Sequence, residues 1–379
     1  MRILITGGAG FIGSNLASEL YVRGHEVTVL DNLSPQIHGE NAKESPLLEF
    51  VFPKVRFVEG CVTERKIVEE VIRGQEVIVH FAAETGTGQS MYMVDRYAKV
   101  NIQATALLLD ILSADKNHSI QRLIVASSRS IYGEGKYLSA NRSPVYPDQR
   151  SLSDLEAQRY ELYDENGAPL KLVATDEKAR IHPSSVYGIT KQVQEQLIMT
   201  VCPTIGIEPV ALRYQNVFGP GQSLSNPYTG ILSIFSNLIL QGKQINVFED
   251  GLESRDFVYI DDVVTATALA IEHEQAANSV FNVGSGKATT VLEVVEELQK
   301  QLGESAGYRV SHEFRLGDIR HNVADLTQIS QKLGFQPSVS FAAGIEQFSE
   351  WVKELGPAKS AYDDSLAEMR KRGLMKGQE

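Results

Sequence analysis

A tyrosine and a lysine stand four residues apart in the segment SSVYGITKQ, as Tyr187 and Lys191. One turn of an α-helix would place the two side chains on the same face. A phenol beside an ammonium group is an acid–base pair, because the positive charge favours the phenolate that accepts a proton. The same spacing also fits a tyrosine packed beneath an ordinary surface lysine. The segment alone leaves both interpretations open.

A cluster of glycines near the start of the chain indicates a second kind of chemistry. Gly7, Gly10 and Gly13 follow the apolar run RILIT and open a segment with helical periodicity. The spacing G-x-x-G-x-x-G between a strand and a helix is a variant of the dinucleotide-binding fingerprint. Glycine lets a pyrophosphate approach the backbone, and the N-terminus of the helix attracts its charge. The cluster therefore predicts a dinucleotide site that includes Phe11 and Ile12.

Asp31 ends the next strand-like run, EVTVLD. A carboxylate at this place accepts hydrogen bonds from the ribose hydroxyls of NAD and repels the 2′-phosphate of NADP. The alternative is an aspartate that caps the turn in DNLS. With the glycines in place, we prefer the ribose role, which Asn32 would assist.

Strands and helices alternate through the first half of the chain. The strand-like runs are RILIT, EVTVLD, VRFVEGCV, EVIVHFAA, QRLIVASS and EPVALRY, and helical segments lie between them. This alternation implies crossover connections and a parallel sheet, and runs that are apolar nearly throughout suit strands buried on both faces. The predicted fold class is α/β, a Rossmann-type doubly wound parallel sheet with a smaller mixed α/β substrate lobe.

The second half of the chain is more mixed. We expect an NAD-binding domain over residues 1–217, to which about 256–276 return, a lobe over 218–355, and a charged tail over 356–379 that is a peripheral helix or a frayed end. A long insertion covers about 134–180, and its segment RYELYDENGAPLKLVAT predicts a hairpin around ENGAP. A loop of this length is usually functional or disordered.

The bulk composition excludes several classes of function. The net charge of -12 argues against a general polyanion-binding surface, so no nucleic-acid partner is expected. The two cysteines, Cys61 and Cys202, form neither a metal-binding pattern nor a disulfide framework. The N-terminus begins with a strand pattern rather than a signal peptide, and the apolar runs are too short to span a bilayer. We therefore expect a cytoplasmic protein with no membrane partner and no metal.

A series of motifs resembles the extended short-chain dehydrogenase/reductases, namely GGAGFIG, LDN, HFAA, SSRSIYG, YGITK, RDFVYIDD and RLGDIRHN. The resemblance covers roughly residues 1–350. It is closest to the NAD-dependent nucleotide-sugar epimerase/dehydratase branch, and within it to 4-epimerases of dTDP-L-rhamnose and of UDP-glucose. It implies a catalytic set of Ser128, Tyr187 and Lys191. Tyr187 would remove the proton of a sugar hydroxyl while hydride leaves the carbon for NAD+, and Ser128 would hydrogen-bond the reacting oxygen.

The resemblance also implies two sets of binding residues. The cofactor set is Gly7, Gly10, Phe11, Ile12, Gly13, Asp31, Asn32, Cys61, Val62, Phe81, Ala82, Ala83, Asn101, Tyr187 and Lys191. The substrate set, for a nucleotide-diphosphate sugar, is Ser128, Ser130, Asn216, Arg255, Arg315 and Asp318.

Some members of these sets have more specific roles. Arg255 and Arg315 match the pair that binds the diphosphate, because an arginine fork donates two hydrogen bonds and stays charged. Asn216 would touch the sugar diphosphate, and Asp318 would contact the distal ribose or hold an arginine. Asn101 would brace the active-site loops, although it could equally cap its own helix.

Three departures from the family pattern bear on which reaction the chain can catalyse. Cys61 stands where relatives often have an aspartate that reaches the adenine, and the long insertion is unusual. Arg129 and Ser130 follow Ser128, where dTDP-glucose 4,6-dehydratases carry the Asp-Glu pair that eliminates water. Without those groups dehydration lacks its proton carriers, and this loop also lacks the cysteine acid of the 3,5-epimerases.

The remaining reaction is 4-epimerisation through a transient 4-keto sugar. We expect a dTDP- or UDP-linked hexose or deoxyhexose as substrate, a role in surface-polysaccharide synthesis, and NAD that stays bound. The alternatives are a 4-keto reductase, a decarboxylase or a dehydratase of the same branch, or a non-catalytic NAD-sensing protein. The resemblance also implies a homodimer built from the helix near Val100 and the helix that carries Tyr187.

Overall fold

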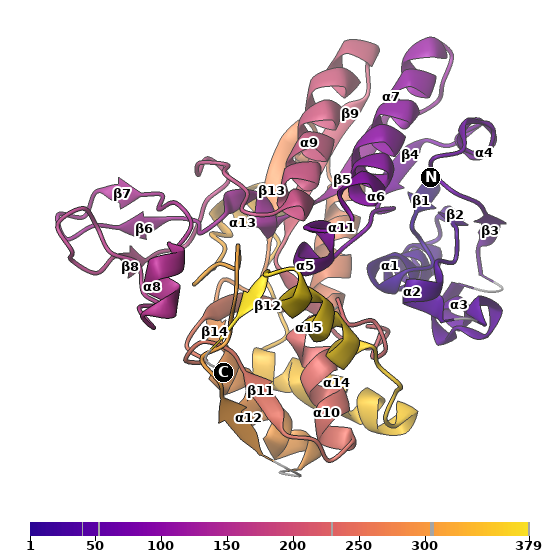
Figure 1. Cartoon of the computed structure of the whole chain (residues 1–379). Helices are drawn as coiled ribbons and strands as arrows, with labels where there is room; N and C mark the ends of the chain where they lie inside the picture. The colour runs from indigo at the N-terminus through magenta and orange to yellow at the C-terminus, as the bar shows by residue number, and fades with distance from the viewer. Residues whose placement is uncertain (40, 52–53, 229, 304–306, 378–379) are drawn as a thin grey trace.

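The computed structural model describes residues 1–39, 41–51, 54–228, 230–303 and 307–377, and its centre is a seven-stranded sheet (Figure 1). The strands, in the spatial order β3-β2-β1-β4-β5-β9-β13, are β3 (Arg56–Glu59), β2 (Glu26–Asp31), β1 (Arg2–Thr6), β4 (Val77–His80), β5 (Arg122–Ser128), β9 (Glu208–Tyr214) and β13 (Ser279–Val283). Every neighbouring pair in this sheet is parallel. The doubly wound parallel sheet predicted from the sequence is therefore confirmed.

Alternate residues of the strands enter two separate hydrophobic cores, as the pleat of a strand requires. In β1, Ile3 and Ile5 belong to one core, and Leu4 belongs to the other. The first face is covered by α1 (Phe11–Val22) and α11 (Ile260–Glu272). The second face is covered by α4 (Arg65–Val71), α7 (Ala104–Ala114) and α9 (Val186–Val201), and Figure 1 shows α7 and α9 side by side. Helices on both faces explain why the strands are apolar nearly throughout.

The seventh strand, β13, is absent from the strands that the sequence predicts. Its residues SVFNV pair with β9 in the register Ser279↔Val210 to Val283↔Tyr214. The expected return of about 256–276 overlaps α11, and β13 follows that helix. A five-residue run carries too little periodicity to be separated from a loop. The domain boundaries themselves stay a prediction.

A smaller lobe follows the sheet domain, and Figure 1 shows it below the sheet. Its strands are β10 (Asn216–Phe218), β12 (Ser254–Tyr259) and β14 (Ala288–Thr290) in one sheet, and β11 (Ile245–Val247) and β15 (Tyr308–Val310) in another. Its helices are α10 (Ile231–Leu240), α12 (Val291–Leu302) and α14 (Phe341–Leu355), with α13 (Thr327–Leu333) beside β13.

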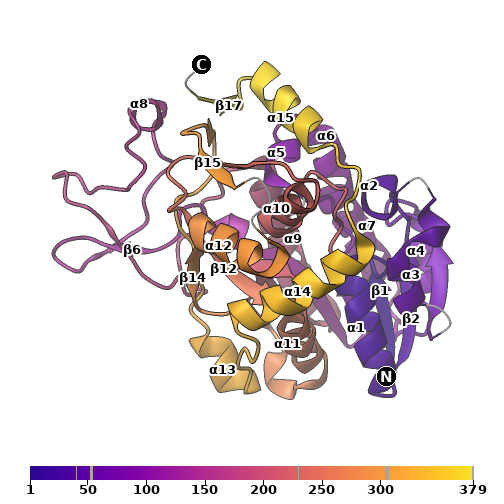
Figure 2. The same cartoon turned by 90° about the horizontal axis from the view of Figure 1, so that it is seen from below.

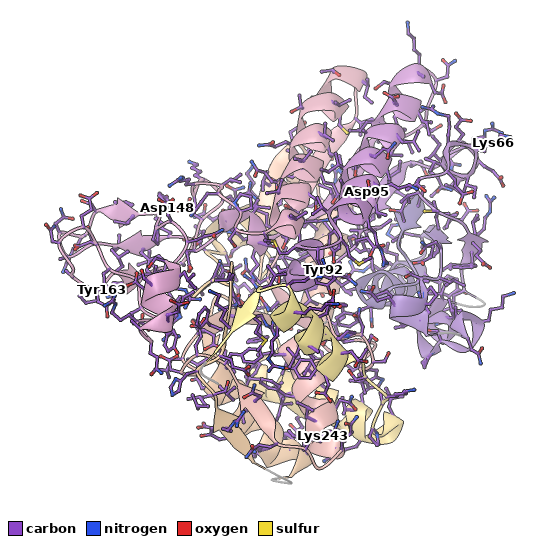
Figure 3. All side chains as sticks on the ribbon, viewed as in Figure 1. Lys66, Tyr92, Asp95, Asp148, Tyr163 and Lys243 are labelled. Atoms are coloured by element: carbon purple, nitrogen blue, oxygen red, sulfur yellow. The ribbon has the colours of Figure 1, made fainter. Side chains whose placement is uncertain are left out.

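The insertion folds into a small unit that projects to one side of the molecule (Figures 1 and 2). It contains β6 (Tyr137–Leu138), β7 (Pro144–Val145), α8 (Leu152–Glu156) and β8 (Lys171–Leu172), and the strands pair in the order β7-β6-β8. A turn at Gly167, with φ of 78°, is closed by an antiparallel bridge between Tyr163 and Pro169. The hairpin predicted around ENGAP is therefore present, and Figure 3 shows Tyr163 on the projecting unit.

The C-terminal segment is ordered against the lobe rather than frayed. It forms α15 (Tyr362–Lys371) and β17 (Met375–Lys376), and β17 pairs antiparallel with β16 (Phe314–Arg315). Met369 and Met375 are buried in the main core. The Arg372 guanidinium lies 4.7 Å from the ring of Tyr92, which Figure 3 shows close to α15. The tail thus packs on the lobe through β16 and reaches a loop of the sheet domain at Tyr92.

Short helical segments complete the connections. They are α2 (Pro35–His38), η1 (Ala42–Glu44), α3 (Pro46–Val51), α5 (Thr87–Ser90), α6 (Val94–Tyr97), η2 (Ala98–Gln103), η3 (Arg129–Tyr132), η4 (Cys202–Ile205) and η5 (Glu274–Ala276). Within the described ranges, no helix has both the length and the apolar character needed to cross a membrane.

Candidate active site

A cavity of about 550 Å³ lies at the carboxyl ends of the sheet strands, and both the sheet domain and the lobe contribute to its walls. Open parallel sheets bind ligands in the crevice at this edge. All the residues predicted for the cofactor and the substrate line it, with the exception of Asn101. The fold thus brings together residues that lie as far apart in the sequence as Gly7 and Asp318. Their individual roles stay predictions.

Asn101 lies behind the cavity wall. Its side chain accepts a hydrogen bond from the backbone N–H of Glu84 (2.8 Å) and donates to the Glu84 carbonyl (3.1 Å) and the Thr190 hydroxyl (3.0 Å). These contacts tie the loop after β4 to α9. Of the two interpretations from the sequence, the contacts support the brace.

In the glycine turn between β1 and α1, Gly10 is less tightly enclosed than Gly7 and Gly13. A Cβ atom on Gly7 would lie 2.7 Å from the backbone nitrogen of Ala82, and one on Gly13 would lie 2.5 Å from the carbonyl oxygen of Gly7. A Cβ on Gly10 would meet its nearest atom at 3.3 Å. Among the described residues, no side chain caps α1 at Gly10, so the first N–H groups of the helix are free for a phosphate. The turn therefore fits a dinucleotide.

Asp31 makes the turn contacts that one of its two predicted roles requires, and the other role stays a prediction. One carboxylate oxygen accepts from the backbone N–H of Ala9 in the glycine turn (3.0 Å), and the other accepts from the N–H of Leu33 (2.9 Å). The carboxylate thus holds the turn after β2 and also faces the cavity. Each carboxylate oxygen accepts more than one hydrogen bond, so acceptor sites remain for ribose hydroxyls.

Tyr187 stands in the first turn of α9, beside the end of β5. Ser185 caps the helix by accepting from the N–H of Gly188, which fixes where α9 begins. Burial raises the pKa of the Tyr187 phenol, while a hydrogen bond to Ser128 and the charge of Arg129 lower it. The Ser128 hydroxyl also lies 2.5 Å from that of Ser130. Ser128 and Tyr187 therefore present adjacent hydroxyls to the cavity.

Lys191 is buried on the same face of α9. Burial lowers the pKa of its ammonium group to about 7, against the opposing charge of Glu195. Its Nζ donates to the side-chain oxygen of Gln194. Close to neutral pH, the Lys191 ammonium can therefore release or regain a proton.

A buried polar chain that sequence reasoning missed continues behind Lys191. Gln194 donates to the Thr105 hydroxyl at 3.0 Å, and that hydroxyl donates to the Asn101 carbonyl at 2.7 Å. Its proton is thus used, so Nε2 of His80, 3.1 Å away, is the donor in that contact, and Nδ1 accepts from Thr6. Burial, and then the charge of Lys191, lower the pKa of His80 to about 3, which keeps the ring neutral. The motif HFAA contains this histidine, but nothing local to the motif reveals its partners.

The predicted diphosphate arginines differ in how many donors they have left. The terminal nitrogens of Arg255 donate to the Asp318 carboxylate (2.8 Å) and to backbone carbonyls of Ser254 and of residues 319–320. The Arg315 guanidinium lies 4.7 Å from the centre of the Phe248 ring, and its Nε has no hydrogen-bond partner among the described residues. Arg315 is therefore available to a ligand, whereas Arg255 mainly holds the protein.

Arg129 is a third arginine in the cavity, and it was absent from the predicted site residues. Its Nε donates to the Asn216 side chain at 2.8 Å. Burial, and then the charge of Arg255, lower its pKa to about 10, so it stays charged. Burial raises the pKa of Asp318, but Arg255 and Arg315 outweigh that effect and hold the pKa at about 2. Arg129 directly follows Ser128 in the sequence, and that position is the signal that could have identified it.

Glu253 is a buried carboxyl group in the cavity wall that the sequence did not indicate. One of its oxygens has no hydrogen-bond partner among the described residues. Burial, and then the charge of Glu249, raise its pKa to about 8. Glu253 is therefore largely protonated at neutral pH and adds little negative charge to a cavity that holds three arginines.

Comparison with known proteins agrees with this geometry. The sequence model of the NAD dependent epimerase/dehydratase family matches residues 3–151 and 160–284. The dTDP-L-rhamnose 4-epimerase of Burkholderia thailandensis is 37% identical over 355 residues, which are 93% of this chain and 95% of that protein.

Solved structures give the same result at the level of the fold. The UDP-glucose 4-epimerase of Thermotoga maritima, solved with UDP-glucose, superposes with a TM-score of 0.75 at 30% identity, over 94% of this chain and 99% of that one. The UDP-glucuronic acid 4-epimerase of Bacillus cereus, solved with UDP-glucuronic acid and NAD, gives 0.76 at 26% identity, over 94% and 100%. The resemblance inferred from the sequence motifs is confirmed.

Proposed function

Since the chain belongs to the NAD-dependent epimerase/dehydratase family, we propose that it is a nucleotide-sugar 4-epimerase that acts through a transient 4-keto sugar. The observation that carries the proposal is the residue next to Ser128. There the chain holds Arg129, a cation bonded to Asn216, at a place where dehydration would need a proton-carrying carboxyl group. The similarity to proteins named as 4-epimerases supports the same reaction.

NAD is the cofactor of this family, and the glycine turn and Asp31 fit it. Bound NAD supplies a hydride acceptor and donor at the sugar C4. Tyr187 takes the proton of the C4 hydroxyl and returns it, and Ser128 hydrogen-bonds the same oxygen. Positive charge from Arg129 and the hydrogen bond with Ser128 stabilise the phenolate against the cost of burial. The chain's own groups thus hold and move one proton.

The arginines suggest how the diphosphate is bound. Arg315 has an unpartnered Nε, and the terminal nitrogens of Arg129 make no hydrogen bond with the described residues. A buried donor without a partner, as the Arg315 Nε is, is costly and favours an anionic ligand that accepts from it, and the Arg129 terminal nitrogens can donate to the same anion. We therefore assign the main phosphate contacts to Arg129 and Arg315, and to Arg255 the task of holding Asp318.

The substrate we propose is a dTDP- or UDP-linked hexose or deoxyhexose used in surface-polysaccharide synthesis. The proposal also includes a homodimer in which α7 and α9 of two copies pack together. Ile189 on α9 supports this, because its side chain is a large apolar group left 48% exposed. Light scattering tests the dimer, and a monomeric mass at micromolar concentration would exclude it.

The activity is tested with purified protein and no added cofactor. We would incubate it with dTDP-, UDP-, GDP- and CDP-sugars, including dTDP-L-rhamnose and UDP-glucose, and separate the products. The expected result is interconversion of one C4 epimer pair, together with NAD released by denaturing the protein. Net consumption of added NADPH with formation of a reduced sugar would instead establish a 4-keto reductase. Loss of CO2 or water from the sugar would establish a decarboxylase or a dehydratase.

A further inference from the structure

The turn of residues 248–250 connects the cavity with the insertion. Phe248 lines the cavity beneath Arg315. The next residue, Glu249, has φ of 48°. This value lies in the left-handed region, which residues other than glycine rarely adopt. Its carboxylate is buried, and Glu249 is not among the residues that line the cavity. A strained, buried glutamate needs a partner that holds it in place.

That partner is Arg150, which the insertion supplies between β7 and α8. Its two terminal nitrogens grip the Glu249 carboxylate at 2.6 and 2.9 Å, in a bidentate fork. The side chains are only 2% and 5% exposed, so water screens the pair little. The same guanidinium donates to the Asp318 carbonyl at 3.0 Å. One side chain of the insertion, that of Arg150, therefore holds both the segment that contains Glu249 and the segment that contains Asp318.

A second ion pair links the same parts of the chain. Arg320, which is fully buried, grips the Asp250 carboxylate at 2.7 and 2.9 Å and reaches Glu161 of the insertion at 2.6 Å. Its backbone N–H donates to Glu134 at 2.7 Å. The insertion thus contributes one cation, Arg150, and two carboxyl groups, the buried Glu134 and the half-exposed Glu161, to one cluster. Each of its charges has an opposite partner, as burial requires.

The segment of residues 318–320 lies between the insertion and the cavity. Arg255 holds it from the cavity side, through the Asp318 carboxylate and the carbonyls of residues 319–320. Arg150 holds it from the other side, through the Asp318 carbonyl. A shift of this segment would move Arg255 and Asp318 together.

We propose that Arg150 is a positioning residue for the substrate, which makes the insertion a structural part of the nucleotide-diphosphate subsite. It acts through Glu249 on Phe248 and Arg315, and through the Asp318 carbonyl on Arg255. The inference rests on the proposed function, because it presumes that these cavity residues bind a nucleotide sugar. Misplacing binding groups by about 1 Å can cost on the order of a hundredfold in rate, so loss of this fork has a measurable effect.

Two variants separate positioning from simple loss of stability. Arg150→Lys keeps the charge but replaces the fork with a point charge. Arg150→Met/Glu249→Gly removes both members of the pair, leaves no carboxylate unpaired at residue 249, and places glycine at the left-handed position. The matched control is Arg159→Lys, because Arg159 pairs with Asp154 in the same insertion but both side chains are exposed.

The measurements are kcat and KM for the nucleotide sugar that the wild type converts, calorimetric binding of dTDP and of UDP, NAD content and melting temperature. We expect both Arg150 variants to raise KM about tenfold or more, weaken binding of the nucleoside diphosphate equally, and keep kcat within about threefold. NAD content should stay at the wild-type value. Arg159→Lys should change none of these quantities.

A wild-type KM in the double variant would overturn the inference, because the subsite would then form without Arg150. Unchanged KM in Arg150→Lys, with an active wild type, would also overturn it and leave the proposed function standing. A wild-type protein that retains NAD, binds neither dTDP nor UDP and converts no nucleotide sugar would remove the proposed function, and the inference with it.

Discussion

The two halves of the cavity are built by different physical means. The cofactor half is mostly backbone: the turn at Gly7 and Gly13 admits no side chain, and Asp31 holds it through the N–H of Ala9. The substrate half is mostly charge: arginines and carboxylates from segments up to 159 residues apart neutralise one another. The first half is specified by short stretches of sequence, whereas the second needs the whole fold before its pairs meet.

This difference explains where generality and selectivity lie. Backbone N–H groups around a glycine turn recognise a pyrophosphate in any protein that forms the turn. Recognition in the substrate half depends instead on particular side chains in the cavity wall, namely those of Arg129, Arg315 and Glu253. We therefore expect substitutions in the cofactor half to act on NAD, and those in the substrate half to act on KM or on pH dependence.

The largest effect is expected where the halves meet, at Tyr187. Tyr187→Phe removes the phenol oxygen that we propose as the proton carrier and keeps the ring, so kcat should fall on the order of a thousandfold. NAD content and KM should stay close to wild type. Stopped assays on the substrate found in the panel measure kcat, with Tyr21→Phe, an exposed tyrosine of α1, as the control. Turnover within tenfold of wild type would exclude Tyr187 as the proton carrier.

The same division separates what the sequence predicted from what it could not. Gly7, Gly10, Gly13 and Asp31 were found because the fingerprint lies within one strand–turn–helix unit and its context. The helix that carries Tyr187 was placed from its start because the helical signal is local. The seven motifs in the family order then supplied Ser128, Arg255, Arg315 and Asp318, and the segment LRYQNVFGPG supplied Asn216. All of these residues line one cavity.

The remainder depends on contacts between distant residues. Arg150 and Glu249 give no local signal, because each is an ordinary charged residue until the fold places them 2.6 Å apart. Arg255 was predicted as a phosphate ligand, and only the structure shows its terminal nitrogens bonded to residues 318–320. The strand β13 was missed because a five-residue run becomes a strand only when β9 offers an edge.

The cofactor half can be broken at Gly10 without breaking the fold. Gly10 has φ of -74°, which any residue adopts, and an added Cβ would meet its nearest atom at 3.3 Å. Gly10→Ala places a methyl group in tight contact with the Gly7 carbonyl oxygen, so it should lower the melting temperature of the apoprotein by only a few degrees, while the methyl group obstructs the pyrophosphate. We expect NAD affinity, measured by calorimetry, to fall roughly ten- to a hundredfold.

Gly13→Ala is the contrasting variant, since its Cβ would lie 2.5 Å from a backbone oxygen. It should lower both the melting temperature and the NAD affinity. Equal NAD binding by Gly10→Ala and wild type would show that the pyrophosphate does not pass over this glycine.

The substrate half should affect the pH dependence of stability through Glu253. Its folded pKa of about 8 lies above the ordinary value of 4.5, so its contribution is complete below pH 4.5 and is lost as the pH rises through 8. Glu249 and Asp318 raise the pKa, Arg255 lowers it, and Arg320 lies 3.9 Å away. Glu253→Gln should thus stabilise the protein at pH 8.5 by about 1 to 2 kcal/mol relative to pH 5.

Denaturant unfolding at the two pH values measures this difference, and Glu296→Gln, at an exposed position of α12, is the control. Part of the slope should persist in Glu253→Gln, because burial also raises the pKa of Glu134, to about 7. A slope identical to wild type would place the Glu253 carboxyl in water rather than in the wall of the substrate half.

The smallest expected effect tests whether the substrate half depends on local structure at all. Thr290 caps α12 by accepting from the N–H of Glu293 (3.2 Å), and the Glu293 carboxylate accepts in return from the N–H of Thr290 (2.6 Å). The next residue, Val291, lines the cavity and donates its N–H to the Glu253 carbonyl. The capping box, which is a local structure, thus lies directly beside the wall of the substrate half.

Loss of the Thr290 cap costs about 1 kcal/mol, because the N–H of Glu293 in the first turn loses its acceptor. Thr290→Ala should therefore lower the free energy of unfolding by about that amount, while KM for the nucleotide sugar and NAD content stay within twofold. If KM rose as much as in the Arg150 variants, the substrate half would depend on local helix geometry as strongly as on its long-range ion pairs. An unchanged KM beside a lowered stability would show that the ion pairs hold the subsite even when the neighbouring helix end is weakened.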